Sequence, residues 1–245
     1  MHRRNELTAR YGLIGRKLGH SFSPSYFRQK FEENDLDAEY VLYELDQIEK
    51  VVDIFKEGIN GLNVTIPYKN AILPFLNHID VAAREIGAVN CIHNSNGQFI
   101  GYNTDWLGFT QSLKENLGDA RPAALVLGSG GSSRAVQYSL KKLGISYTVV
   151  SRSENGIGYE ALNETIIRSN QLIINTTPLG MFPDTKVAPK IPYEYIDDQH
   201  FLFDLIYNPE KTLFLTLGFE RGARIQNGWP MLKYQAEASW QIWNS

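Results

Sequence analysis

The stretch Ala123-Ala-Leu-Val-Leu-Gly-Ser-Gly-Gly-Ser-Ser-Arg134 decides the fold of this chain. Its first five residues are apolar without a break, which is typical of a central strand in a parallel sheet covered on both faces. The glycines that follow fit the pattern Gly128-x-Gly130-x-x-Ser133, and a helical pattern begins at Ser133. In this setting Gly128 allows a tight turn, Gly130 lets the backbone approach a pyrophosphate, and a small residue at 133 lets the helix pack on the strand. The stretch therefore predicts a dinucleotide-binding turn.

The helix after this turn strengthens the prediction. Its N-terminus presents backbone N–H groups and the positive end of the helix dipole to phosphate oxygens. We therefore expect the coenzyme to contact the residues of the turn and of the first helical turn: Gly128, Ser129, Gly130, Gly131 and Ser132.

The end of the next strand predicts which dinucleotide binds. NAD-specific folds usually carry Asp or Glu about 20 residues after the turn, where the carboxylate binds the ribose 2′-hydroxyl. Here the strand at 147–150 ends in Ser151-Arg152-Ser153, with Glu154 close by. A guanidinium flanked by hydroxyls suits a 2′-phosphate, because Arg presents paired donors to phosphate oxygens. The sequence predicts NADP, held by Ser151, Arg152 and Ser153.

Strands and helices alternate along the rest of the chain. Strands at 171–175 and 201–206 follow the first two at intervals that favour βαβ units and a parallel sheet. The first hundred residues also read as short strands alternating with helices. We expect an α/β protein of two domains, an N-terminal α/β substrate domain and a Rossmann-type dinucleotide-binding domain, joined near residues 103–106. Helices are expected at 23–33, from Asp46 to about residue 59, and at 80–86, 105–117, 133–143 and 230–243, with a hairpin turn at Asn94-Ser-Asn-Gly97.

Composition limits the classes of function. The chain has 245 residues, 43% of them hydrophobic and 21% charged, and a net charge of −3. This balance gives no basic field for nucleic acid or membrane surfaces. Cys91 is the only cysteine and the five histidines lack ligand spacing, so we expect neither a disulfide framework nor a metal site. No apolar run suits a membrane span and no leader pattern follows Met1, so we expect a cytoplasmic protein.

Polar residues interrupt the apolar pattern where strands of the first domain end. They occur in Asn63-Val-Thr-Ile-Pro-Tyr-Lys69, at Asn90 and in Asn103-Thr-Asp105. Residues at strand ends line the ligand crevice in open α/β folds. Hydroxyls, carboxamides, an ammonium and a carboxylate suit a small polyhydroxylated acid. Each residue also has a structural explanation, such as a helix cap or a core amide, and it is their combination that favours a site.

Seven motifs together resemble the shikimate dehydrogenases, in that family's order and at about its spacing. They are Ser21-Phe-Ser23-Pro24, Asn63-Val-Thr-Ile-Pro-Tyr-Lys69, Gly87-Ala-Val-Asn90, Asn103-Thr-Asp105, Gly128-Ser-Gly-Gly-Ser-Ser-Arg134, Asn175-Thr-Thr-Pro-Leu-Gly-Met181 and Met231-Leu-Lys-Tyr-Gln235. The resemblance implies reversible NADPH-dependent reduction of 3-dehydroshikimate to shikimate, a step of aromatic amino acid (chorismate) biosynthesis. It also implies a monomer or homodimer whose small-molecule substrate lies in a cleft.

The resemblance assigns roles to individual residues. It implies that Lys69 and Asp105 are the catalytic pair, and it extends the coenzyme site to Thr176 and Gly228. It places these residues at the substrate: Ser21, Ser23, Thr65, Asn90, Asp105, Tyr207 and Gln235. The last helix returns to the first domain, so that we expect residues 1–104 and 230–245 to form the substrate domain and 105–229 the NADP domain.

The chemistry of the pair agrees with this reading. Reduction of a ketone requires hydride at carbon and a proton at oxygen. The Lys69 ammonium can stabilise the developing alkoxide and donate that proton, and Asp105 can orient it and bind a substrate hydroxyl.

The chain departs from the family pattern at two places. The usual Asn-Arg-Thr is Ser151-Arg152-Ser153, and Asn155 and Gly156 stand where a second basic residue would follow. The usual Gly-Leu-Gly-Met before the last helix is Gly228-Trp-Pro-Met231. Two alternatives therefore stay open: a quinate/shikimate dehydrogenase that uses NAD, and a dinucleotide-binding regulator without catalysis. The presence of both Lys69 and Asp105 argues against the regulator.

Overall fold

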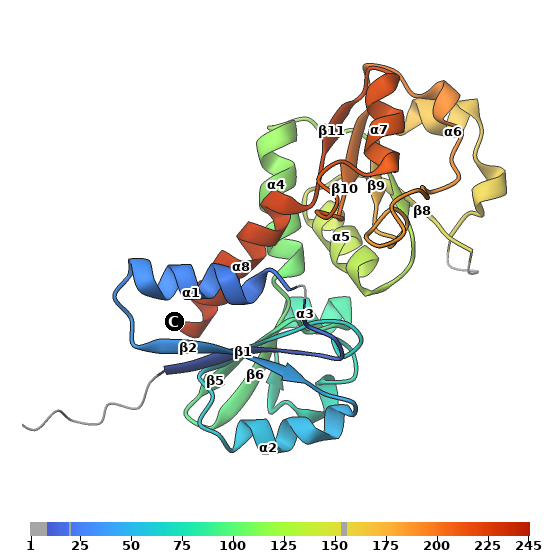
Figure 1. The fold of residues 1–245 in the computed structure, drawn as a ribbon. Coiled ribbons are helices and arrows are strands. Elements are labelled where there is room, and N and C mark those ends of the chain that lie inside the picture. The colour runs from blue at the N-terminus through green and yellow to red at the C-terminus, as the bar shows by residue number, and fades with distance from the viewer. Residues whose placement is uncertain (1–8, 20, 153–155) are drawn as a thin grey trace, which may run out of the picture. The chain divides into compact units, whose positions relative to one another are not determined.

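The computed structural model describes residues 9–19, 21–152 and 156–245. It divides into two compact units (Figure 1), one containing the chain up to Thr104 together with Ala236–Ser245, the other Asp105–Gln235. The second boundary falls inside helix α8 (Trp229–Trp243), six residues after the position expected from the sequence. Each unit has its own sheet and its own apolar cores.

In the described part of the first unit, six strands form one mixed sheet in the order β2-β1-β3-β5-β6-β4. β1 pairs in parallel with β2 and β3, whereas β5 is antiparallel to both β3 and β6. The β5–β6 hairpin turns at Asn96 and Gly97, both with positive φ, as the Asn-Gly pair predicts. The strands are β1 Ala9–Gly15, β2 Ala38–Glu44, β3 Gly61–Val64, β4 His78–Ile79, β5 Cys91–Ser95 and β6 Gln98–Tyr102.

Helices cover both faces of this sheet (Figure 1). α1 (Ser23–Glu33) and the C-terminal part of α8 cover one face, while α2 (Val51–Phe55) and α3 (Val81–Ile86) pack on the other. Because side chains alternate along a strand, Leu62 and Val64 enter the core beneath α2, and Asn63 points to the face that α8 covers. Short 3₁₀ turns lie at η1 Ile48–Lys50 and η2 Leu73–Phe75.

In the described part of the second unit, five parallel strands have the order β11-β10-β9-β7-β8. α4, α5 and the N-terminal part of α8 cover one face, and α6 and α7 cover the other. The strands are β7 Ala124–Leu127, β8 Tyr147–Val150, β9 Leu172–Asn175, β10 Phe201–Asp204 and β11 Arg224–Gln226. The helices are α4 Asp105–Leu117, α5 Gly131–Lys142, α6 Glu164–Ser169 and α7 Leu213–Glu220, with 3₁₀ turns η3 Tyr159–Ala161 and η4 Tyr193–Tyr195.

The strand order places a ligand crevice in this unit. The chain passes from β7 to β8 on one side and then returns to β9 on the other side of β7. Such a reversal leaves an open crevice outside the carboxyl ends of the two strands that flank it. Those ends are Leu127 of β7 and Asn175 of β9.

One predicted helix is wrong in extent. The helix expected from Asp46 to about residue 59 begins as a 3₁₀ turn at Ile48 and is α-helical only over Val51–Phe55. The N-cap position belongs to Gln47, and the Asp46 carboxylate pairs with Lys50 at 2.7 Å. None of the described helices is both long enough and apolar enough to cross a membrane.

Candidate functional site

The turn between β7 and α5 requires glycine at 128. Gly128 has a φ of +108°, and a Cβ there would lie 2.8 Å from Thr176 Oγ1 and 3.0 Å from Thr177 Cγ2. Its N–H donates to the Val150 carbonyl at 2.8 Å, and the Thr176 hydroxyl donates to the Leu127 carbonyl at 2.6 Å. The turn is therefore fastened to the ends of both neighbouring strands.

Helix α5 begins directly after this turn. The helix begins at Gly131, two residues earlier than expected, with Gly130 as N-cap, so that Gly131 and Ser132 lie in its first turn. Ser133 is fully buried and its hydroxyl donates to the Gly128 carbonyl at 2.7 Å. A small residue here lets α5 approach β7 and aims its first N–H groups at the crevice.

A cavity of about 1160 Å³ occupies this crevice. It is lined by Gly128, Ser129, Gly130, Ser151, Arg152, Tyr159, Glu160, Thr176, Thr177, Pro178, Leu179, Val187, Ala188 and Lys190. Six residues expected at the coenzyme thus lie along one cavity: Gly128, Ser129, Gly130, Ser151, Arg152 and Thr176. Ser153 lies outside the described residues. Gly131, Ser132 and Gly228 are not among the lining residues.

The residues present fit a dinucleotide phosphate. The glycine turn leaves the space that a Cβ would fill, a twelve-residue helix begins there, and a guanidinium lines the same cavity. Tyr159 is half-buried, which raises its pKa, and the nearby charge of Arg152 acts in the opposite direction. The Tyr159 hydroxyl is therefore within range of the Arg152 charge, and both residues line the cavity.

Gly228 is required by the backbone around it. Its N–H donates to the Ile206 carbonyl at 2.9 Å, and a Cβ there would collide with the Leu205 carbonyl oxygen. The segment before α8 is thereby fastened to the loop that carries Tyr207. Tyr207 is half-buried, with its ring centroid 6.2 Å from that of Trp229, and burial raises its pKa.

Asp105 and Gln235 lie on two packed helices of the second unit. Asp105 is the first residue of α4 and is 4% exposed. One turn later Gly108 allows a close crossing, since a Cβ there would lie 2.8 Å from the backbone N of Gln235 on α8. The crossing fixes both helices at the level of these two side chains.

In the first unit, Thr65, Lys69 and Asn90 come together at the ends of β3 and β5. The Val64 N–H donates to the Asn90 carbonyl at 2.9 Å, and the Val89 N–H donates to the Lys69 carbonyl at 2.8 Å. The Lys69 side chain is half-buried. Asn90 is 4% exposed; its side chain donates to Thr104 Oγ1 at 3.0 Å and accepts from the Thr104 N–H at 2.6 Å.

Ser21 and Ser23 flank the start of α1 in the same unit. The Ser21 N–H donates to the Leu18 carbonyl at 2.9 Å. Ser23 is the first helical residue and Phe22 holds the N-cap position, so Ser23 does not cap this helix. The side chain of Ser23 is instead hydrogen-bonded to Tyr40.

A chain of hydrogen-bonded polar side chains continues from the half-buried Tyr40 to the fully buried Thr104. The Tyr40 hydroxyl donates to Asn63 Oδ1 at 2.8 Å, Asn63 Nδ2 donates to Ser239 Oγ at 2.9 Å, and that hydroxyl lies 3.2 Å from Thr104 Oγ1. The chain thus connects the hydrogen bonds of Ser23 with those of Asn90. Sequence reasoning missed Tyr40 and Ser239, because nothing in their local pattern distinguishes them from surface residues of a strand and a helix.

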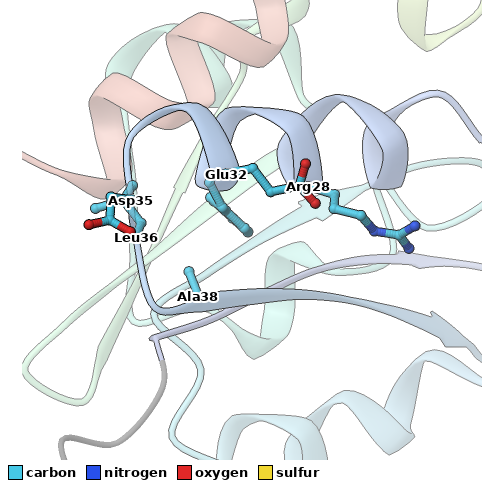
Figure 2. A pocket seen from close by; sticks show the side chains of 6 residues that line it. Arg28, Glu32, Asp35, Leu36 and Ala38 are labelled. Atoms are coloured by element: carbon cyan, nitrogen blue, oxygen red, sulfur yellow. The ribbon is translucent and has the colours of Figure 1, made fainter.

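A smaller hollow of about 320 Å³ lies elsewhere in the first unit (Figure 2). It is formed by α1 and the turn that leads to β2, and its labelled residues are Arg28, Glu32, Asp35, Leu36 and Ala38. None of the residues predicted for the site lines it, so it is separate from the candidate site. Within residues 9–19, 21–152 and 156–245, no group of three His, Cys, Asp or Glu side chains could hold a metal ion.

Comparisons with known proteins agree with these features. The profile of the shikimate dehydrogenase substrate-binding domain matches residues 13–92. A shikimate dehydrogenase (NADP(+)) of Methanococcus maripaludis is 40% identical, over 95% of this chain and 90% of its own. The crystal structure of shikimate dehydrogenase from Aquifex aeolicus superposes with a TM-score of 0.88 at 34% identity, covering 98% of this chain and 94% of that one.

The structure of a quinate dehydrogenase is also similar. Quinate dehydrogenase from Corynebacterium glutamicum, in complex with NAD, has a TM-score of 0.88 at 25% identity, covering 96% of this chain and 93% of that one. The fold is therefore common to both activities, while the sequence is nearer to the shikimate enzymes. This chain belongs to the shikimate dehydrogenase family.

Proposed function

We propose that this chain is an NADP-dependent shikimate dehydrogenase, which reversibly reduces 3-dehydroshikimate to shikimate. The observation that carries the proposal is the cavity lined both by the glycine turn, which ends at Gly130, the N-cap of α5, and by Arg152. A pyrophosphate suits the turn and the helix N-terminus, and a 2′-phosphate suits the guanidinium. The 40% identity to a shikimate dehydrogenase (NADP(+)) supports the same assignment.

NADPH supplies the hydride when it is bound, and the protein supplies the proton. In the proposal the Lys69 ammonium donates it to the ketone oxygen of 3-dehydroshikimate and stabilises the negative charge that develops there. The hydrogen bond from the Val89 N–H to the Lys69 carbonyl fixes the backbone from which the Lys69 side chain extends. Asp105, buried at the start of α4, accepts a hydrogen bond from a substrate hydroxyl.

The remaining polar residues bind and orient the substrate in this proposal. Ser21 and Ser23 lie at the start of α1, and Thr65 and Asn90 at the ends of β3 and β5. Their hydroxyls and carboxamide match a small acid with several hydroxyl groups. Tyr207 and Gln235 are the two further residues proposed to bind the substrate. The proposed substrate domain is the first unit, up to Thr104 together with Ala236–Ser245, and the proposed coenzyme domain is Asp105–Gln235.

Initial rates test the proposal directly. Purified protein is assayed at neutral pH by absorbance at 340 nm, with shikimate or quinate against NADP⁺ or NAD⁺. We expect turnover with shikimate and NADP⁺ and little in the other three combinations. Faster turnover with quinate or NAD⁺ would assign the chain to the quinate branch, while folded protein that binds nucleotide without turnover would be a regulator.

We further propose that the enzyme acts in the cytoplasm as a monomer or homodimer. Its one cysteine, Cys91, is fully buried, and burial raises the pKa of the thiol to about 12. A single buried thiol forms no disulfide within the chain, so folding does not require an oxidising compartment. Light scattering coupled to size exclusion gives the oligomeric state, and cell fractionation gives the location.

A further inference from the structure

The sequence near β8 supplies only one cation, Arg152, for binding a 2′-phosphate. A 2′-phosphate carries close to two negative charges at neutral pH, and a single exposed guanidinium meets only part of them. Asn155 and Gly156 follow where a second cation would be expected. The structure offers another cation from a distant part of the chain.

Lys190 lines the same cavity as Arg152. It belongs to the segment between β9 and η4, thirty-eight positions further along the sequence, and its side chain is exposed. Nothing in its local sequence marks it as a binding residue. Its place in the cavity comes from tertiary packing.

Three observations relate this segment to the residues around Arg152 in the cavity. Tyr159 is a close electrostatic neighbour of Arg152. Tyr159, Ala188 and Tyr193 pack on the same apolar cluster. The Tyr193 hydroxyl donates to the Pro189 carbonyl at 2.9 Å, which fixes the residue immediately before Lys190, and Tyr193 is within electrostatic range of Tyr159.

Among the described residues that line the cavity, Glu160 is the acid. Its carboxylate is folded back over its own 3₁₀ turn, where a Cβ on Gly158 would collide with it. Among the lining residues that the structure describes, the cations Arg152 and Lys190 outnumber this acid. This balance favours an anionic group over a neutral hydroxyl at that end.

We propose that Lys190 is the second cation of the 2′-phosphate subsite and, with Arg152, determines the preference for NADP over NAD. The inference rests on the proposed coenzyme site. Lys190 replaces across the crevice the basic residue that the loop after β8 lacks. A flexible ammonium can reach a phosphate oxygen as a point charge without the paired geometry of a guanidinium.

Binding of two coenzymes to a matched set of variants tests the inference. Dissociation constants for NADP⁺ and NAD⁺ are measured by titration calorimetry for the wild type, Lys190→Gln and Lys190→Arg. Lys186→Gln is the control, because Lys186 is an exposed lysine in the same segment that does not line the cavity. We expect Lys190→Gln to weaken NADP⁺ binding roughly tenfold and NAD⁺ binding less than about twofold, as for loss of one hydrogen bond to a charged group.

The controls make the other outcomes decisive. Lys190→Arg should keep the preference for NADP⁺, and Lys186→Gln should bind both coenzymes as the wild type does. If Lys190→Gln behaves like Lys186→Gln, or weakens both coenzymes equally, Lys190 is not part of the phosphate subsite. A wild type that binds neither coenzyme would overturn the proposed function itself, whereas an NADP⁺ preference unaffected by Lys190→Gln would overturn only this inference.

Discussion

Asp204 shows how a single buried group organises the coenzyme crevice. Its carboxyl is inaccessible to solvent and accepts hydrogen bonds from Thr212 Oγ1 at 2.6 Å, the Ile206 N–H at 3.0 Å and Asn175 Nδ2 at 3.1 Å. Asn175 in turn accepts from the N–H and hydroxyl of Thr177, which lines the cavity. One carboxyl therefore connects the end of β10 with the cavity wall after β9.

This carboxyl should make stability depend on pH. Burial raises the pKa of Asp204 to about 6, and the three hydrogen bonds limit the rise. Because the folded value lies above the unfolded one, the group's favourable contribution is complete below about pH 4 and is lost as pH rises through 6, by up to about 3 kcal/mol. We expect the difference in unfolding free energy between wild type and Asp204→Asn to fall over this range.

Urea denaturation at several pH values between 4 and 7.5 measures that difference. The quantity to compare is the slope of the unfolding free energy with pH. The substitution also alters hydrogen bonds, which shifts the unfolding free energy by a similar amount at every pH. The exposed Asp184, changed to Asn, is the control and should leave the slope as in the wild type. Parallel curves for wild type and Asp204→Asn would contradict the prediction.

Lys69→Ala tests the proposed proton donor. Removal of a general acid typically costs 10²- to 10⁴-fold in rate. We expect kcat with 3-dehydroshikimate and NADPH to fall by about that factor, with little change in KM, because the ammonium acts on charge that develops only in the transition state. Steady-state kinetics decide the matter. An effect confined to KM would make Lys69 a binding residue.

At the scale of elements, the C-terminal part of α8 completes the first unit. Trp243 is 5% exposed, stacks on Tyr11 at 4.9 Å and donates from Nε1 to the Ile92 carbonyl at 2.9 Å. Its indole lies where a Cβ on Gly61 would be, so β3 and α8 approach as closely as the backbone allows. The core beneath α1 therefore depends on the last helical turn.

Trp243→Ala should destabilise the first unit by about 3–5 kcal/mol, the usual cost of removing a buried Trp from a core. Trp243→Phe keeps most of the ring contact and loses the hydrogen bond, so its loss should be smaller. Chemical denaturation followed by circular dichroism compares the two with the wild type. A loss below about 1 kcal/mol for the alanine variant would show that α8 contributes little to this core.

The sequence predicted the elements whose pattern is local. The apolar run before Gly128, the Asn-Gly hairpin and the helix between Asp80 and Gly87 are all confirmed, because each depends on neighbouring residues. β4 and β11 were missed, since strands of two and three residues carry no periodicity. The helix after Asp46 was overestimated, because local spacing cannot tell a 3₁₀ start from a full α-turn.

The candidate site shows the same limit. The glycine turn and Arg152 could be found from spacing along the chain. Tyr159 and Lys190 could not, because only the packing of η3 and the segment before η4 brings them to the same cavity. Tyr40 and Ser239 are likewise polar partners that meet only after β2 and α8 are in place.

At the scale of the whole molecule, the proposed binding surfaces belong to different units. Ligands that bind only the folded state stabilise it by about 2.7 kcal/mol at a hundred times the dissociation constant. We expect NADP⁺ to slow amide hydrogen exchange in peptides covering 127–134 and 174–180, and shikimate to slow it in peptides covering 61–69 and 88–104. Exchange followed by mass spectrometry measures both effects.

The Arg152→Gln variant is the matched control for this experiment. At the same NADP⁺ concentration it should show weaker protection of 127–134 and unchanged protection by shikimate. Protection by NADP⁺ confined to the first unit would contradict the assignment of the coenzyme cavity.

The passage of α8 from one unit to the other has a consequence for biosynthesis. Residues 236–245 leave the ribosome after all of 105–235, yet they complete the core that Tyr11 and Phe27 begin. During translation the whole sequence of the second unit is available before residues 236–245 are made. Until then the aromatic face of the first unit, made earlier, stays uncovered. A nascent chain interrupted within α8 would therefore expose that face to chaperones and proteases.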